Sequence, residues 1–245
     1  MDQLSKLQEV LGNLYNEFFA KMNIDPQSGK IRDSSKWSGS RFVSMPFIGL
    51  NYLNAPKKIL FVGLDVGNDE GKDHILTFEE RRESNMSAAG SSPHMSGTYI
   101  TALYLLREKY ADAWQRISER KELFKTLAKD QTLPDDVMDH ITMVNRWKFV
   151  TANRELRHGA KDRFYRDEKL EIHLLYKEIE LLNPDIVWFQ GDPKGAATYE
   201  FLDTLKEQGR VIYLANHPSR AFPIEINGEK IDCRKVEYLK KLLPR

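Results

Sequence analysis

The sequence has few cysteines and no long apolar run, the features that mark disulfide-bonded, iron–sulfur, secreted and membrane-spanning proteins. Its 245 residues include one cysteine, Cys233, which excludes an internal disulfide and an iron–sulfur cluster bound by several thiolates of this chain. It has no long apolar run, and its N-terminal stretch mixes charges into an apolar stripe, so neither a secretory leader nor a membrane span is expected. We therefore expect a cytoplasmic protein with no membrane partner.

The chain also lacks an excess of charge of one sign and the patterns of common cofactor sites. Lysine and arginine number 37 against 36 aspartates and glutamates, so a nucleic-acid surface would need local clustering of basic residues. The six histidines include no close pair at metal-ligand spacing, and neither the phosphate-loop motif nor the dinucleotide fingerprint is present. We expect no metal and no cofactor.

The apolar pattern that is present predicts an α/β fold for a single domain, residues 1–245. Buried strands are predicted at the start of 59–67 and at 141–144, 185–189 and 210–215. Helices are predicted at 3–22, 97–129, 168–182, 194–207 and 234–243. We expect a three-layer α/β/α sandwich around a short, mainly parallel sheet of about four strands.

The remaining segments differ in character. Residues 23–57 contain prolines and glycines without periodicity and predict a long loop, and residues 68–94 are polar. A helical insertion at about 97–139 separates the first two strands. Asn227-Gly228, between alternating apolar residues, predicts a two-residue β-hairpin.

Two of the predicted strands end abruptly in polar, turn-forming residues. Asp65 follows the first in ILFVGLDVG, and His217 follows the last in VIYLANHPS. Because the carboxyl ends of parallel strands lie along one edge of a sheet, where α/β proteins bind ligands, we expect the two side chains to share a cleft.

These strand exits, with the LNPDIVWFQG segment between them, resemble the uracil-DNA glycosylase superfamily over roughly residues 57–220. The glycine-rich family motif is matched by Gly63, Asp65 and Gly67, with Val66 at its proline position. The second family motif, His-Pro-Ser, is present unaltered as residues 217–219. One cluster-cysteine position of the iron–sulfur branches is Phe149 here, so the resemblance is to a branch without a cluster.

The resemblance implies an enzyme that flips uracil or a related deaminated base out of DNA and hydrolyses its N-glycosidic bond. Asp65 would orient the attacking water and stabilise the cationic sugar, while His217 would donate to the base oxygen as it becomes anionic. Gly63 and Gly67 would let the backbone approach the sugar-phosphate closely.

Further roles follow from the same resemblance. MVNRWKF is similar to the family strand that ends in a base-reading asparagine, which gives this role to Asn145; Asn153 in FVTAN is the alternative. Phe78, thirteen residues after Asp65, is the candidate ring that stacks on the base.

DNA is the expected partner. The resemblance places Ser219 and Arg220 on phosphates and Phe222 as an apolar wedge in the duplex. Residues 146–166 interleave basic and aromatic residues, a composition that suits a nucleic-acid backbone, and here we expect Arg146 and Lys148 to contact DNA.

Each of these residues also has an ordinary structural interpretation. Asp65 could cap a helix, His217 could lie in a simple turn, and Asn145 could satisfy backbone groups at a strand end. His94, next to Pro93 in a loop, could reach the cleft, but we expect it in a solvated loop. The stretch 146–166 could be a solvated face.

Two other functions stay open at this stage. Val66 and the long insertion favour an inactive superfamily member that binds nucleic acid or nucleotides. The third possibility is a hydrolase of free nucleosides or another small glycoside.

Overall fold

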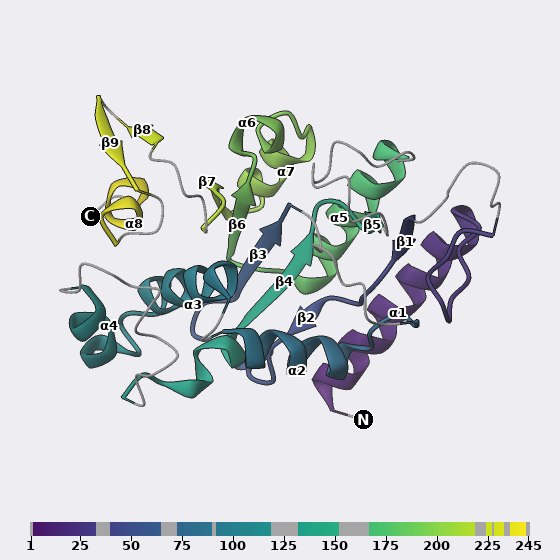
Figure 1. Ribbon diagram of the computed structural model, residues 1–245, viewed down its shortest axis with the longest axis horizontal. Helices are drawn as coiled ribbons and strands as arrows, with labels where there is room; N and C mark the ends of the chain where they lie inside the picture. Colours follow the sequence, from purple (N-terminus) through teal and green to yellow (C-terminus); the bar gives the residue numbers. More distant parts are fainter. Residues whose placement is uncertain are drawn as a thin grey trace.

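The computed structural model describes most of the chain, and its centre is a mixed sheet with helices on both sides (Figure 1). The described residues are 2–32, 40–64, 73–89, 92–118, 132–151, 167–218, 224–226, 228–232 and 236–243. The α/β architecture predicted from the sequence is confirmed.

The sheet has five strands in the order β2-β4-β3-β6-β7. Four are parallel and correspond to the predicted strands: β3 (Ile59–Gly63), β4 (Ile141–Asn145), β6 (Ile186–Gly191) and β7 (Val211–Asn216). The fifth, β2 (Phe47–Ile48), pairs antiparallel with β4 inside the segment predicted as a long loop. That part of the prediction is wrong, because a two-residue strand is too short to show alternation.

Two small antiparallel ribbons accompany the main sheet. One joins β1 (Ser40–Phe42) to β5 (Phe149–Thr151). The other joins β8 (Ile224–Ile226) to β9 (Glu229–Ile231) and confirms the predicted hairpin, since Ile226 pairs with Glu229 across a two-residue turn.

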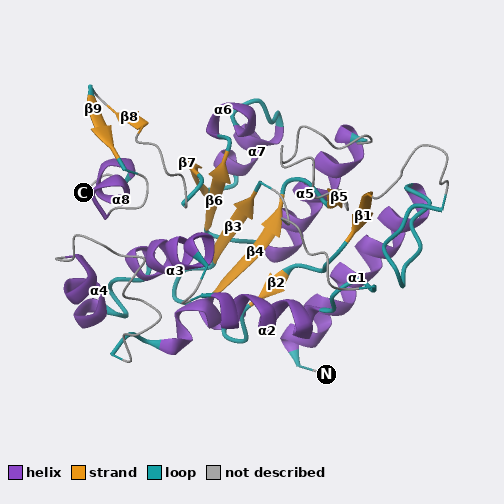
Figure 2. Ribbon diagram, in the orientation of Figure 1, coloured by secondary structure: helices purple, strands orange, loops and turns teal. Residues whose placement is uncertain are grey.

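Helices cover both faces of the sheet (Figure 2). The first face is covered by α2 (Phe78–Ala88), α3 (Pro93–Leu105), α4 (Ala111–Ser118), the 3-10 helix η4 (Asp135–His140) and α8 (Val236–Leu242). The second face is covered by α1 (Gln3–Lys21), α5 (Glu168–Leu182), α6 (Pro193–Ala196) and α7 (Phe201–Glu207). A short 3-10 helix, η2 (Tyr52–Asn54), precedes β3. None of the helices in these described stretches is long and apolar enough to cross a membrane.

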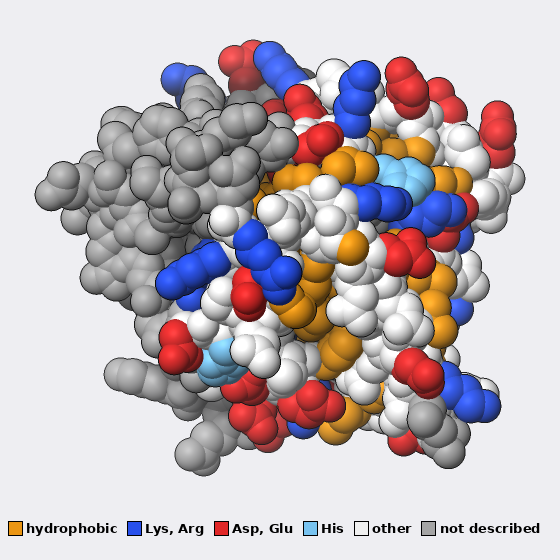
Figure 3. Space-filling view, turned by 90° about the vertical axis from the view of Figure 1, so that its right-hand side faces the viewer, with side chains coloured by type: hydrophobic (Ala, Val, Ile, Leu, Met, Phe, Trp, Pro, Cys, Tyr) orange, Lys and Arg blue, Asp and Glu red, His pale blue; other side chains and the backbone are white. Residues whose placement is uncertain are grey.

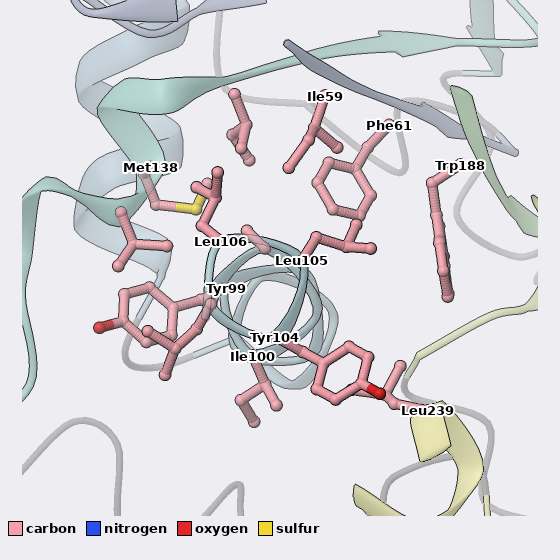
Figure 4. Close-up of a cluster of buried hydrophobic side chains, with 14 of the residues drawn as sticks. Ile59, Phe61, Tyr99, Ile100, Tyr104, Leu105, Leu106, Met138, Trp188 and Leu239 are labelled. Atoms are coloured by element: carbon pink, nitrogen blue, oxygen red, sulfur yellow. The ribbon is translucent and has the colours of Figure 1, made fainter. Parts of the chain in front are cut away.

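Helix α3 lies in the middle of the first face and is buried along nearly its whole length. Figure 4 shows its side chains between Ile59 and Phe61 of β3, Trp188 of β6, Met138 of η4 and Leu239 of α8. Removing a large apolar side chain from such a core typically costs about 2–5 kcal/mol. The dense packing therefore fixes the position of the residues at the start of α3.

On the second face, α1 and α5 pack together over a buried polar group. Tyr15 donates its hydroxyl hydrogen to Glu178, and the Lys148 ammonium forms an ion pair with the same carboxylate. The backbone N–H of Lys148 also donates to Glu171 at 2.7 Å. Burial, followed by the charge of Glu178, raises the pKa of Tyr15 well above its ordinary value. The phenol therefore stays protonated at neutral pH.

Helix α2 lies in the polar segment for which no helix was predicted. Its residues have no apolar period, but Thr77 and Glu80 form a capping box: Glu80 N–H donates to Thr77 Oγ1 at 3.2 Å, and Thr77 N–H donates to Glu80 Oε2 at 2.9 Å. The predicted helices at 3–22 and 168–182 are confirmed as α1 and α5, while 194–207 is divided into α6 and α7.

Candidate functional site

The chain connects β3 to its neighbour β4 on one side and β6 to its neighbour β7 on the other, so the connections diverge between β3 and β6. After β3 the chain continues through helices of the first face to β4, and after β6 it continues through α6 and α7 of the second face to β7. In open α/β sheets, ligands bind outside the carboxyl ends of the strands at such a switch point. The residues at these strand exits are therefore the first candidates for a functional site.

Polar residues on the first face lie at or directly after the ends of β4, β6 and β7. Gly63 pairs with Asn145 in the parallel register, and Val62 pairs with Phe189, so Gln190 lies at the level of Gly63 on its other side. Alternation places these residues on the face of Phe61, Met143 and Trp188. His217 directly follows β7. We refer to these residues, together with His94 from the start of α3, as the strand-exit cluster: Gly63, His94, Asn145, Gln190 and His217.

Gly63 and Asn145 fit each other closely. A Cβ added to Gly63 would meet Oδ1 of Asn145 at 2.6 Å, closer than real contacts allow. The Asn145 side chain therefore lies over the backbone of β3, in space that only glycine leaves open. The amide is half-buried, and it makes no hydrogen bond with any residue that the structure describes. No described residue occupies its donor or its acceptor.

A chain of hydrogen bonds connects Gln190 to the start of α3. Gln190, which is buried at the end of β6, donates Nε2–H to Thr98 Oγ1 at 3.0 Å, and its Oε1 lies 3.0 Å from Nε2 of His94. His94 was expected in a solvated loop, and that expectation is wrong. Pro93 opens α3, so His94 lies in its first turn and reaches the sheet.

His217 lies against His94. The centroids of the two imidazole rings are 4.6 Å apart, with a 34° angle between their planes. The end of β7 is held by Tyr238 of α8, whose hydroxyl accepts a hydrogen bond from Asn216 N–H at 2.7 Å. Three strand spacings of about 4.8 Å separate β7 from β4, so roughly 14 Å lies between the strands that carry His217 and Asn145.

Arg146 lies on the opposite side of the sheet edge from Asn145. Its guanidinium covers the rings of Trp147 at 4.5 Å and Tyr199 at 4.8 Å, and Nη1 is 3.6 Å from Oδ2 of Asp192. Only 10 % of the side chain is exposed. Burial also raises the pKa of Tyr199, so its phenol is neutral. Arg146 therefore braces the ends of β4 and β6 from the second face.

Lys148 does not reach the surface where a phosphate contact was expected. Its side chain is 3 % exposed and forms the ion pair with Glu178, which is fully buried. This location corrects the predicted DNA contact, because the ammonium is enclosed between helices of the second face. The sequence pattern gave no sign of the pairing, since Glu178 lies thirty residues away.

Phe78, the candidate stacking ring, lies elsewhere. It begins α2 and packs, half-buried, against the apolar cluster of the second face. The structure thus brings Gly63, Asn145 and His217 to one edge and one face, while Phe78 packs with the cluster of the second face.

Five further predicted site residues lie outside the described residues: Asp65, Gly67, Ser219, Arg220 and Phe222. The alternative reader Asn153 lies outside them as well. Leu64, the last described residue after β3, accepts a hydrogen bond from Trp147 N–H at 3.1 Å.

Sequence reasoning missed Gln190 and Thr98 as neighbours of the site, and it gave the cleft only as the alternative location of His94. One local signal was present: Ser92-Pro93 is a typical helix start, and residues four apart, such as His94 and Thr98, share a helix face. The contact with Gln190 depends on how α3 packs across the sheet, which no local pattern gives.

Other surfaces of the described chain offer less. Within the described ranges, no group of three or more histidine, cysteine, aspartate or glutamate residues is placed to hold a metal ion. On the face seen in Figure 3, acidic and basic side chains are interspersed among the coloured residues. A hollow of about 150 Å³ lies between α1 and α5, lined by Leu14, Phe18, His173 and Leu174 among others, and is not part of the strand exits.

Comparison with known proteins assigns no family to the chain. Neither a protein-family model nor a curated protein matches the chain.

Proposed function

We propose that the protein is a DNA glycosylase that hydrolyses the N-glycosidic bond of uracil or a related deaminated base. The single observation that carries the proposal is the Asn145 amide, half-buried at the end of β4 and without a hydrogen bond to any described residue. An amide offers one acceptor and a donor group side by side, which complements the Watson–Crick edge of uracil.

The proposed chemistry uses the two strand exits on either side of the switch point. Water, oriented by Asp65, forms a bond to C1′ of the sugar while the bond from C1′ to the base nitrogen breaks. The electron pair leaves with the base, and Asp65 takes up the proton of the water. His217 donates a hydrogen bond to the base oxygen as charge develops there, a contribution typically worth about 10²–10³ in rate.

Two features of the cluster support these roles. Gly63 leaves the space beside the backbone of β3 that the Asn145 amide occupies, so the absence of a Cβ allows the amide its position at the strand exit. His217 is held against a second ring and follows a strand end that is itself hydrogen-bonded to Tyr238. A donor that is already oriented loses little free energy to reorganisation during the reaction.

The test is base release from oligonucleotides that contain one uracil, single- and double-stranded, detected by alkaline cleavage of the abasic site. Asp65→Asn and His217→Ala should each lower the rate by about 10²–10³. Asp203→Asn and His173→Ala change exposed residues of α7 and α5 and serve as matched controls with unchanged rates. Absence of release of any deaminated base by the wild type would reject the proposal.

One observation favours a second candidate, a hydrolase of free nucleosides. Arg146 and Lys148 are enclosed within the fold, so the described strand-exit edge lacks two of the cations expected to hold a DNA backbone. Deoxyuridine and the uracil oligonucleotide should be compared in the same assay. Faster cleavage of deoxyuridine would favour this candidate, and salt-dependent DNA binding without cleavage of either would favour an inactive binding module.

A further inference from the structure

His94 is a member of the strand-exit cluster that the proposed chemistry does not use. It belongs to the segment between the first two strands, and its ring is half-buried. The ring contacts two other members at once: Nε2 faces Oε1 of Gln190 at 3.0 Å, and the ring lies 4.6 Å from that of His217.

The hydrogen bonds around Gln190 assign the proton of His94. Thr98 Oγ1 donates to the backbone oxygen of His94 at 3.1 Å, and Thr98 Oγ1 accepts from Nε2 of Gln190. Oε1 of Gln190 therefore acts as the acceptor toward the imidazole, and His94 carries its hydrogen on Nε2. The bond to a residue that is 2 % exposed restricts rotation of the His94 ring.

From this geometry we propose that His94 is a positioning residue that holds the imidazole of His217 in the orientation needed for its hydrogen bond to the base. This inference rests on the proposed glycosylase function. The support for the ring is the buried helix α3 on one side and Gln190 of β6 on the other. The packing of the His94 ring against the His217 ring favours one orientation of His217.

The positive end of the α3 dipole adds a second reason for this arrangement. His94 lies in the first turn of a thirteen-residue helix, where a positive charge is unfavourable. A neutral ring can lie against His217 without charge repulsion. The position therefore requires an uncharged planar group that donates to Gln190, and a glutamine side chain is also such a group.

The experiment measures uracil release and the histidine resonances of three variants: His94→Ala, His94→Gln and the exposed control His173→Ala. In His94→Ala, kcat should fall about 10- to 100-fold with KM within about 2-fold of wild type, because misorientation of a catalytic group affects the chemical step. His94→Gln should recover most of that loss, and His173→Ala should equal wild type.

The NMR measurement does not depend on activity. In wild type, the ring protons of His217 should resonate away from the positions of the exposed His173, and His94→Ala should move them toward those positions. The inference would be overturned by an unchanged kcat in His94→Ala or by His217 resonances that do not move. It would also be overturned if activity fell together with Tm and glutamine failed to restore it. Absence of uracil release by the wild type would reject the proposed function, and the His217 resonances would still decide whether His94 fixes the ring.

Discussion

The imidazole rings of His94 and His217 lie 4.6 Å apart although they come from different layers of the fold. His94 begins a helix on the first face, and His217 follows the last strand of the main sheet. They meet because α3 packs against β3 and β6 and carries its first turn to the carboxyl edge of the sheet. The function proposed for that edge leads to the following predictions.

Gly63→Ala should reduce uracil release by about 100-fold, because the new Cβ would lie only 2.6 Å from Asn145 Oδ1 and displace the amide proposed to read the base by about 1 Å. Gly12→Ala in α1 is the matched control, since a Cβ there meets no atom within 4 Å. Single-turnover rates and urea unfolding of both variants provide the measurement. Full activity of Gly63→Ala would show that Asn145 does not read the substrate from its present position.

Lys148→Met should destabilise the fold by about 3–5 kcal/mol, because it leaves the buried Glu178 carboxylate without its cation. Lys206→Met removes the exposed partner of Asp203 and should change the free energy of unfolding by less than about 1 kcal/mol. Urea unfolding at pH 7 compares the two. Equal effects would contradict the assignment of Lys148 to the interior.

Stability should fall as the pH rises above about 10, by up to about 1.4 kcal/mol per pH unit for each buried tyrosine. Burial raises the pKa values of Tyr15 and Tyr52. Above pH 10 the unfolded chain therefore loses phenol protons that the folded chain keeps, and the unfolded state is favoured. Urea unfolding between pH 9 and 11.5 should show a shallower decline in Tyr52→Phe, and an identical slope would contradict the prediction.

Thr77→Ala should destabilise the protein by about 1 kcal/mol, because it removes the hydroxyl that accepts the N–H of Glu80 at the start of α2. Thr77→Ser keeps the hydroxyl and should lie close to wild type. Hydrogen exchange of the first-turn amides of α2, together with urea unfolding, measures the effect. Equal protection in the alanine and serine variants would argue against the capping box.

The sequence predicts the parts of this fold that have a strong local pattern. The strands β3, β4, β6 and β7 were found because apolar runs such as Ile59 to Val62 have no polar residue to interrupt them. Helix α2 was missed because its FEERRESNMSA sequence has no apolar face, and only its cap marks it. Local pattern is therefore sufficient for buried elements and insufficient for polar ones.

The candidate site shows the same division. Gly63, Asn145 and His217 were identified because each closes a recognisable strand, and parallel strands share an edge. The enclosed Lys148 and the contact of His94 with His217 depend on helix packing between distant segments. A basic residue in a basic stretch and a histidine beside a proline look the same in sequence whether they face solvent or another side chain.

The most direct test of the central claim is the amount of free uracil released from a uracil-containing oligonucleotide by the wild type and by Asn145→Ala, with exposed Asn54→Ala as the control. We predict release by the wild type and the control, and a loss of at least about 10²-fold in Asn145→Ala. Equal release by all three proteins, or release by none, would contradict the account.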